Sequence, residues 1–187
     1  MCVIALKLPE ATISDEIIDK CWRANSDGGG FAFSKPFEVI IRKGLMKFDD
    51  FLAAYRDEES RNPNRLAMLH FRIRTHGETN ELNTHPFSVG RGQGAMAHNG
   101  MLSGYDSWGY SGKERDGKSD TNNFVMDHGT DMTFDVVSDI KDKLGEYIGN
   151  YNKFAFIYPD NDYVIVNERQ GSWTKGVWFS NEWWKRK

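Results

Sequence analysis

Cysteine is scarce in this sequence: its 187 residues contain only Cys2 and Cys21, too few for a disulfide framework. Long hydrophobic runs are missing, which argues against a membrane-spanning helix. The first residues also lack the basic and apolar stretches of a secretory signal. Neither sign of charge is in large excess, since 24 Lys and Arg against 27 Asp and Glu give a formal net charge of −3. Bulk charge therefore does not favour nucleic acid or an acidic membrane as a partner, and we expect a cytoplasmic protein with free thiols.

The composition is that of a globular protein. Apolar residues make up 39% and charged residues 27% of the chain, which is ordinary usage for a folded domain. The length favours one domain over residues 1–187, and a chain of this size buries enough surface to need no disulfide.

The order of the expected elements predicts an α+β fold. Strands are expected at 2–8, 31–33, 38–42, 66–71, 93–97, 154–158, 163–168 and 176–180. Helices are expected to begin after Ser14, near Asp49 or Asp50, after Ser119, and near Phe134. Hairpin signals are common and regular βαβ alternation is absent, so we expect antiparallel sheets covered by helices. Residues 103–118 are rich in glycine, serine and charge, which indicates an irregular loop.

Cys2 is a candidate nucleophile. If Met1 is removed, the chain begins with a cysteine whose own α-amine has a pKa of about 7.7–8.0, close to neutrality. That amine can act as general base for the thiol, so no separate histidine is needed. The alternative is that Cys2 is a small buried residue at the start of a core strand.

Asn99 and Gly100 follow a predicted strand and could stabilise an oxyanion. A side-chain amide and a backbone N–H aimed at one point form an oxyanion hole for acyl transfer. The same dipeptide is also common in hairpin turns, and the two interpretations are compatible.

Arg72 and Asp120 supply one cation and one anion, the pair that a zwitterionic amino acid requires. The guanidinium of Arg72 suits a carboxylate, which it can bind bidentately. Asp120 follows Ser119 at a predicted helix start, where N-capping alone would also explain the pattern.

These residues stand in a recognisable order. The motifs are Cys2, Asn25-Ser26-Asp27-Gly28-Gly29-Gly30-Phe31-Ala32, His70-Phe71-Arg72-x-x-Thr75-His76-Gly77, Asn83-x-His85-Pro86-Phe87, His98-Asn99-Gly100 and Ser119-Asp120-Thr121. Together they resemble the glutaminase domain of the class II glutamine amidotransferases, which are N-terminal nucleophile hydrolases. The matching motifs span residues 2–121, and we see no clear marker after about residue 130.

The resemblance implies a fold and a set of roles. The fold would be a four-layer αββα sandwich, with two antiparallel sheets between helical layers. Cys2 would attack the side-chain amide of glutamine, and Asn99 with Gly100 would stabilise the oxyanion. Arg72 would bind the substrate α-carboxylate and Asp120 its α-ammonium group, while the remaining pocket walls would be Thr75 and His76.

The sequence also departs from the family. Ile73 stands where many relatives have an aromatic residue, and Arg74 stands where a small residue is common. We find no segment that could be an ammonia-consuming synthase, so we expect a separate synthase subunit or acceptor as partner. Two alternatives stay open: hydrolysis of a γ-glutamyl or other linear amide, and a non-catalytic regulatory subunit on the same fold.

No cofactor or metal is expected. The five histidines match no zinc-binding spacing, and no carboxylate accompanies them at ligand spacing.

Overall fold

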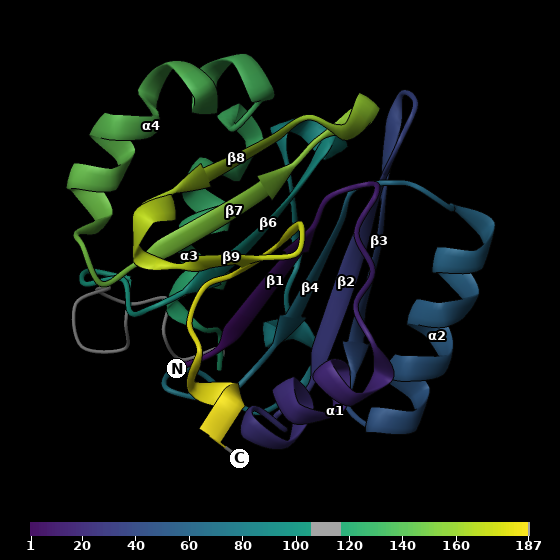
Figure 1. The fold of residues 1–187 in the computed structure, drawn as a ribbon. Helices are drawn as coiled ribbons and strands as arrows, with labels where there is room; N and C mark the ends of the chain where they lie inside the picture. Colours follow the sequence, from purple (N-terminus) through teal and green to yellow (C-terminus); the bar gives the residue numbers. More distant parts are fainter. Residues whose placement is uncertain (106–116, 187) are drawn as a thin grey trace.

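The computed structural model describes residues 1–105 and 117–186, with Arg186 described by its backbone alone. Ten strands form two antiparallel sheets in this part of the chain, and helices lie on the outer face of each sheet (Figure 1). Most of the loop predicted at 103–118 lies outside the described residues.

The first sheet has six strands in the order β3-β2-β4-β1-β10-β9. Their bounds are β1 Val3–Lys7, β2 Gly29–Lys35, β3 Glu38–Leu45, β4 Ala67–Phe71, β9 Ser172–Thr174 and β10 Val177–Phe179. The strand that follows Cys2, β1, is central, with Ile4 opposite His70 of β4 and Ala5 opposite Phe179 of β10. The N-terminal and C-terminal strands are therefore direct neighbours.

The second sheet has four strands in the order β5-β6-β7-β8. They are β5 Phe87–Val89, β6 Gly94–Asn99, β7 Lys153–Ile157 and β8 Tyr163–Val166. Because β6 pairs with β5 before it and β7 after it, Asn99 and Gly100 end an inner strand and do not join two paired strands.

Three apolar clusters define four layers. One lies between the first sheet and two helices, α1 Asp15–Ala24 and α2 Phe48–Arg61. Another lies between the second sheet and the other two helices, α3 Asp120–His128 and α4 Phe134–Ile148. The third fills the space between the sheets and includes Ile4, Met68, Ala97 and Trp178. The four-layer αββα sandwich predicted from the sequence is confirmed.

Alternation along the strands assigns their side chains to layers. In β1, Val3 and Ala5 face the helices, whereas Ile4 and Leu6 face the second sheet. In β6, Met96 faces the helices and Ala97 faces the first sheet. Continuing each alternation, Cys2 and Asn99 point into the space between the sheets.

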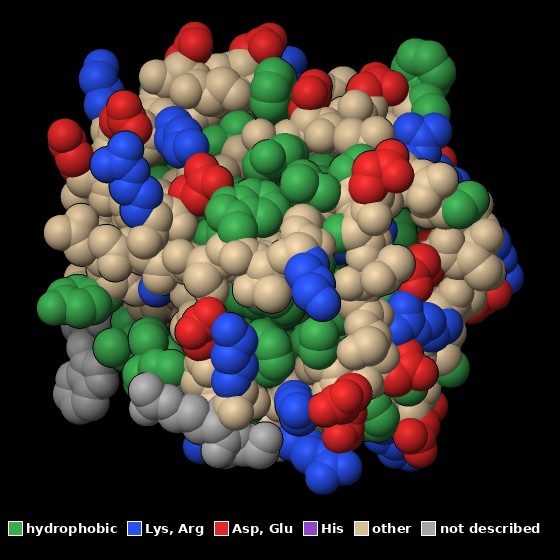
Figure 2. Space-filling model, viewed as in Figure 1, with side chains coloured by type: hydrophobic (Ala, Val, Ile, Leu, Met, Phe, Trp, Pro, Cys, Tyr) green, Lys and Arg blue, Asp and Glu red, His purple; other side chains and the backbone are tan. Residues whose placement is uncertain are grey.

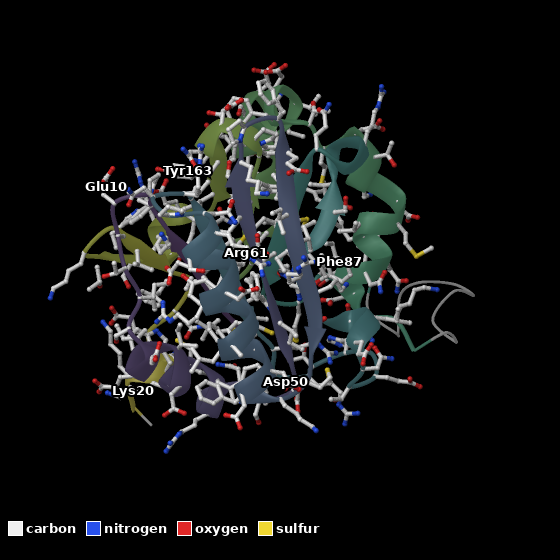
Figure 3. The ribbon with its side chains drawn as sticks, turned by 90° about the vertical axis from the view of Figure 1, so that its right-hand side faces the viewer. Glu10, Lys20, Asp50, Arg61, Phe87 and Tyr163 are labelled. Carbon is white, nitrogen blue, oxygen red and sulfur yellow. The ribbon has the colours of Figure 1, made fainter. Side chains whose placement is uncertain are left out.

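Helix starts follow the local sequence in two of the four cases. The side chains of Ser14 and Ser119 accept a hydrogen bond from a backbone N–H of the first turn of α1 and α3, as predicted. The second helix begins at Phe48, slightly before the predicted position, and Lys47 at its N-cap makes no side-chain bond. Figure 3 shows α2 in front of the first sheet, with Asp50 in its first turn and Arg61 at its end.

Gly30 permits a close approach of two backbone segments. A Cβ atom there would lie 2.4 Å from the carbonyl oxygen of His85 and 2.5 Å from that of Arg42. Only glycine fits between these groups.

Charged side chains of both signs are interspersed on the face that Figure 2 shows. None of the helices in the described part of the chain has the length and apolar character needed to cross a membrane.

Candidate active site

A small cavity of about 20 Å³, room for roughly one water molecule, lies where the two sheets meet the start of α3. Its walls come from five segments: the residue before β1, the segment after β4, the stretch just before β5, the end of β6, and the start of α3. The lining residues are Cys2, Arg72, Ile73, Thr75, His76, His85, His98, Gly100, Ser119, Asp120 and Thr121. Six of the seven predicted site residues are among them, and Asn99 is not.

Cys2 is half-buried and its thiol points to the segment that follows β4. Its Sγ lies 3.5 Å from the carbonyl oxygen of Ile73, to which it donates. Burial raises the pKa of the Cys2 thiol, although the Ile73 carbonyl contact, the chain's amino terminus and the Arg72 guanidinium act in the opposite direction. The thiol is thus protonated at rest, and attack on a substrate requires a base to remove its proton.

Arg72 is held by its backbone and keeps part of its guanidinium unpartnered. Its N–H donates to the carbonyl of Gly28, and its own carbonyl accepts from the N–H of Asp27, both at 2.9 Å. One guanidinium nitrogen donates to the carbonyl of His76 at 3.0 Å. The other is buried with no hydrogen-bond partner in the described residues. A buried cation with free donors on a cavity wall is suited to binding an anion.

Asp120 occupies the first turn of α3. Its Oδ2 accepts from the backbone N–H of Leu102 at 2.8 Å, and its Oδ1 accepts from that of Thr121 at 2.7 Å. Oδ1 also accepts from the Thr121 hydroxyl at 3.3 Å. These bonds orient the carboxylate, and Oδ2 keeps further capacity as an acceptor. The cavity therefore has a cation on one wall and an anion on another.

Gly100 presents its backbone to the cavity in a conformation that favours glycine, with φ +151°. A Cβ atom there would lie 2.0 Å from Oδ1 of Asn152, a contact that no real side chain makes. That oxygen also lies 2.8 Å from Nε2 of His98, whose Nδ1 lies 2.7 Å from the Thr121 hydroxyl. The end of β6 is therefore tied both to α3 and to the residue that precedes β7.

Asn99 is fully buried beside this cavity, and its amide is bonded to the first sheet. Its Nδ2 donates to Oγ of Ser180 at 2.8 Å, and its Oδ1 has no hydrogen-bond partner among the residues described. The same Ser180 oxygen accepts from the backbone N–H of Ile4 at 2.9 Å. Ser180 thus links Asn99 to Ile4, the second residue after Cys2.

Sequence reasoning missed two residues just after β10. Ser180 contacts Asn99 and Ile4, as described above, and Asn181 donates from Nδ2 to the carbonyl oxygen of Cys2 at 2.7 Å. No local signal distinguishes these side chains from ordinary polar residues at a strand end. The pairing of β10 with β1 is what brings them to the nucleophile.

Asn83, which the sequence motif included without a role, connects the segment before it to the start of α3. Its Nδ2 donates to the carbonyls of Glu78 and Gly117 at 3.0 and 2.7 Å. Its Oδ1 accepts from the backbone N–H of Ser119 at 2.8 Å. The Thr75–His76 wall and the Asp120 wall are thereby held together.

Three buried histidines, His70, His85 and His98, lie at or beside the cavity. The rings of His70 and His85 lie 4.0 Å apart between their centroids, and Nε2 of His70 lies 3.2 Å from the carbonyl of His98. Burial lowers the pKa of all three, that of His70 to about 3, so they are neutral at physiological pH.

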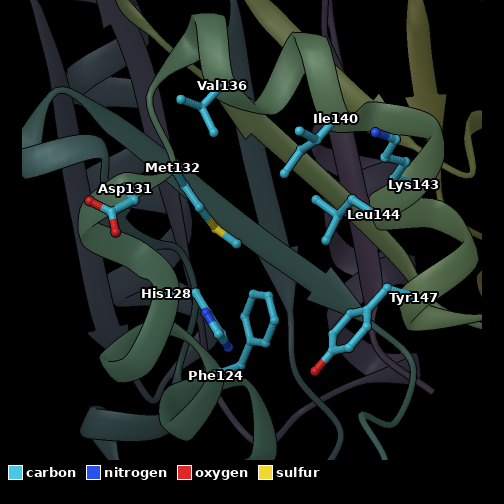
Figure 4. Close-up of a pocket in the computed structure, with 9 residues that line it drawn as sticks. All are labelled: Phe124, His128, Asp131, Met132, Val136, Ile140, Lys143, Leu144 and Tyr147. Carbon is cyan, nitrogen blue, oxygen red and sulfur yellow. The ribbon is translucent and has the colours of Figure 1, made fainter.

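No group of three or more His, Cys, Asp or Glu side chains within residues 1–105 and 117–186 is arranged to hold a metal ion. A larger hollow of about 380 Å³ lies between α3 and α4, where Phe124, Ile140, Leu144 and Tyr147 form apolar walls (Figure 4). None of the seven predicted site residues lines it. The chemistry that the sequence indicates belongs to the smaller cavity.

The fold is that of the N-terminal nucleophile hydrolases, a four-layer sandwich of two antiparallel sheets between helices. Among solved structures, the chain is similar to the glutamine phosphoribosylpyrophosphate (PRPP) amidotransferase from B. subtilis, complexed with ADP and GMP, with a TM-score of 0.52 and 15% sequence identity. The match covers 96% of this chain but only 41% of that one. No protein-family model matches the sequence. At this identity the likeness establishes the fold, and the function is argued from the site.

Proposed function

We propose that this chain hydrolyses the side-chain amide of glutamine through a thioester on Cys2 and releases ammonia. The observation that carries the proposal is the content of one small cavity: a thiol, a buried guanidinium with unpartnered donors, an oriented carboxylate and the backbone of Gly100.

The reaction begins with removal of Met1, which frees the α-amine of Cys2. That amine takes the thiol proton as Sγ attacks the amide carbon, forming a tetrahedral oxyanion. Asn99 and the N–H of Gly100 stabilise the negative oxygen. Collapse breaks the C–N bond, and the ammonium form of the α-amine donates the proton that lets ammonia leave.

Hydrolysis of the thioester completes the cycle. Water attacks the acyl carbon and gives its proton to the α-amine, which passes it to the departing thiolate, so glutamate and free Cys2 are the products. Arg72 binds the α-carboxylate and Asp120 the α-ammonium group of the substrate throughout, with Thr75 and His76 lining the pocket.

The ammonia released would be consumed by a separate synthase subunit or acceptor. The structural neighbour is named for transfer of an amide group, a reaction that requires an acceptor for the nitrogen.

The test is an intact mass measured before and after treatment with a diazoketone analogue of glutamine, which alkylates an activated nucleophile. We expect loss of Met1 and a single adduct that excess glutamine blocks. Cys2→Ala should form no adduct, whereas Cys21→Ala, which removes the other thiol from the core, should form one at the normal rate. An adduct that persists in Cys2→Ala would contradict the assignment, as would a chain that keeps Met1 and still hydrolyses glutamine.

A further inference from the structure

The hydrogen bonds around Asn99 and Ser180 leave two complementary groups unused. Ser180 Oγ is an acceptor in both of its side-chain contacts, from Ile4 N–H at 2.9 Å and from Asn99 Nδ2 at 2.8 Å. The hydroxyl hydrogen has no role in these contacts. At the same time Oδ1 of Asn99, which can only accept, is buried with no partner within the described part of the chain.

Turning the Asn99 amide by 180° about its last bond pairs these two groups. Oδ1 then occupies the place of Nδ2 and accepts the hydrogen of the Ser180 hydroxyl, while Ser180 Oγ continues to accept from Ile4 N–H. The amide nitrogen takes the place of Oδ1, which has no partner among the described residues. Its buried N–H groups are then donors that lack an acceptor until an anion such as an oxyanion reaches them.

We infer that Ser180 is a positioning residue for amide hydrolysis: its hydroxyl donates to Oδ1 of Asn99 and so turns the amide N–H groups toward the oxyanion formed at Cys2. The inference rests on the proposed function. Ser180, which follows β10, would thus affect catalysis only through Asn99 and would not contact the substrate.

The positions of the three residues fit this role. Ser180 Oγ is bonded to Ile4, two residues after the nucleophile, and Ser180 N–H donates to the Ile4 carbonyl at 3.0 Å. Ser180 and Asn99 are both 0% exposed, so water does not compete for their bond. The Ser180 hydroxyl therefore fixes the position of β1, the strand after Cys2 in one sheet, relative to the proposed oxyanion donor Asn99 in the other sheet.

Steady-state kinetics of Ser180→Ala test the inference on the protein with Met1 removed. Loss of an oxyanion donor costs roughly 10²–10³ in kcat, and a donor left free to turn should cost somewhat less, about 10–100-fold. KM should change by less than about threefold, because the oxyanion exists only after attack. Alkylation of Cys2 by iodoacetamide, which needs no oxyanion hole, should keep its normal rate.

A double variant separates positioning from packing. If Ser180 acts through Asn99, Ser180→Ala should have no further effect on kcat in an Asn99→Ala background. Additive losses in the two single variants would overturn the inference. Ser34→Ala is the matched control, because Ser34 is also 0% exposed and also makes two hydrogen bonds, to Tyr158 and Asn161, at another place between the sheets. It should lower stability without lowering kcat.

An atomic-resolution crystal structure gives a readout that does not depend on turnover. The oxygen of Asn99 on the side of Ser180 is the expected result, and the nitrogen there would overturn the inference. Failure of the proposed function is distinguishable, since it would show as a wild-type chain that forms no diazoketone adduct on Cys2. An active wild type with an equally active Ser180→Ala variant refutes the role of Ser180 alone.

Discussion

At the scale of single residues, Gly100 is the position most sensitive to the addition of one methyl group. Its φ of +151° disfavours any other residue, and a Cβ atom would lie 2.0 Å from the side-chain oxygen of Asn152. Displacing Asn152 would also remove a partner of His98. We therefore expect Gly100→Ala to reduce glutamine turnover by at least about 10²-fold, the loss associated with one oxyanion donor.

Gly92→Ala is the control for this substitution. Gly92 also has positive φ, +87°, but a Cβ atom there meets nothing within 4 Å. The strained backbone of Gly92→Ala should therefore lower the stability of the protein by about 1–2 kcal/mol and leave its turnover unchanged. Two measurements on both variants distinguish these effects: the turnover rate at saturating glutamine, and the free energy of unfolding from urea denaturation. Full activity in Gly100→Ala would remove the Gly100 backbone from the proposed mechanism.

Most residues that line the cavity were predictable from the sequence, and the hydrogen bonds that connect them were not. Cys2, Arg72 and Asp120 were predicted from their functional groups and from the order of the motifs, and the structure places them on one cavity. Their catalytic roles stay predictions. Ser180 and Asn181 carried no local signal, because a serine and an asparagine after a strand are typical of any strand end.

At the scale of elements, Asn83 connects two walls of the cavity through backbone groups. It is fully buried and bonds to the segment after Thr75 and His76 and to Ser119, which caps α3. Asn83→Ala removes these bonds and leaves buried carbonyl and N–H groups without partners, each costing about 1–3 kcal/mol. We expect KM for glutamine to rise by about tenfold or more, with a smaller change in kcat, because binding groups lose their positions.

Asn62→Ala is the matched control for this prediction. Asn62 is also buried and also donates from Nδ2 to a backbone carbonyl, that of Glu58, but at the end of α2. Initial rates over a range of glutamine concentrations should show a normal KM for Asn62→Ala. An equal rise of KM in both variants would mean that general destabilisation, and not the connection of the two walls, is the cause.

Elements with a strong local signal were predicted, and two of the three-residue strands, β5 and β9, were missed. The serine caps of α1 and α3 and the buried run that forms β4 are local features, and each was predicted within one or two residues. In contrast, β5 and β9 contain three residues each. Strands this short are defined by pairing with β6 and β10, which no local pattern reveals.

At the scale of the whole molecule, the sandwich brings the two ends of the chain to the same site. Cys2 precedes β1, Ser180 and Asn181 follow β10, and these two strands are paired. The sequence motifs ended near residue 121, yet the last strand supplies partners to both Cys2 and Asn99. The second half of the chain is thus part of the site, and its removal would leave the nucleophile strand without one neighbour.

Stability of the whole molecule should fall as the pH falls below about 6.5, because histidines are buried in the neutral form. Burial lowers the pKa of His70 from its usual value near 6.5 to about 3. Between these values the unfolded chain binds a proton that the folded chain does not, so stability is full above pH 6.5 and is lost toward pH 3. His70 alone should reduce the free energy of unfolding by about 2 kcal/mol at pH 5 relative to pH 7.

Urea denaturation at pH 7, 6 and 5 measures this dependence. The pKa values of His85 and His98 are also lowered by burial, so their effects have the same sign. His70→Gln should reduce the loss of stability between pH 7 and pH 5, whatever its effect at pH 7, because one titrating group is gone. His128→Gln, which replaces an exposed histidine, is the control substitution. A wild-type free energy of unfolding that is the same at pH 5 and pH 7 would mean that the histidines are protonated in the folded protein, and then positive charge would lie at or beside the cavity.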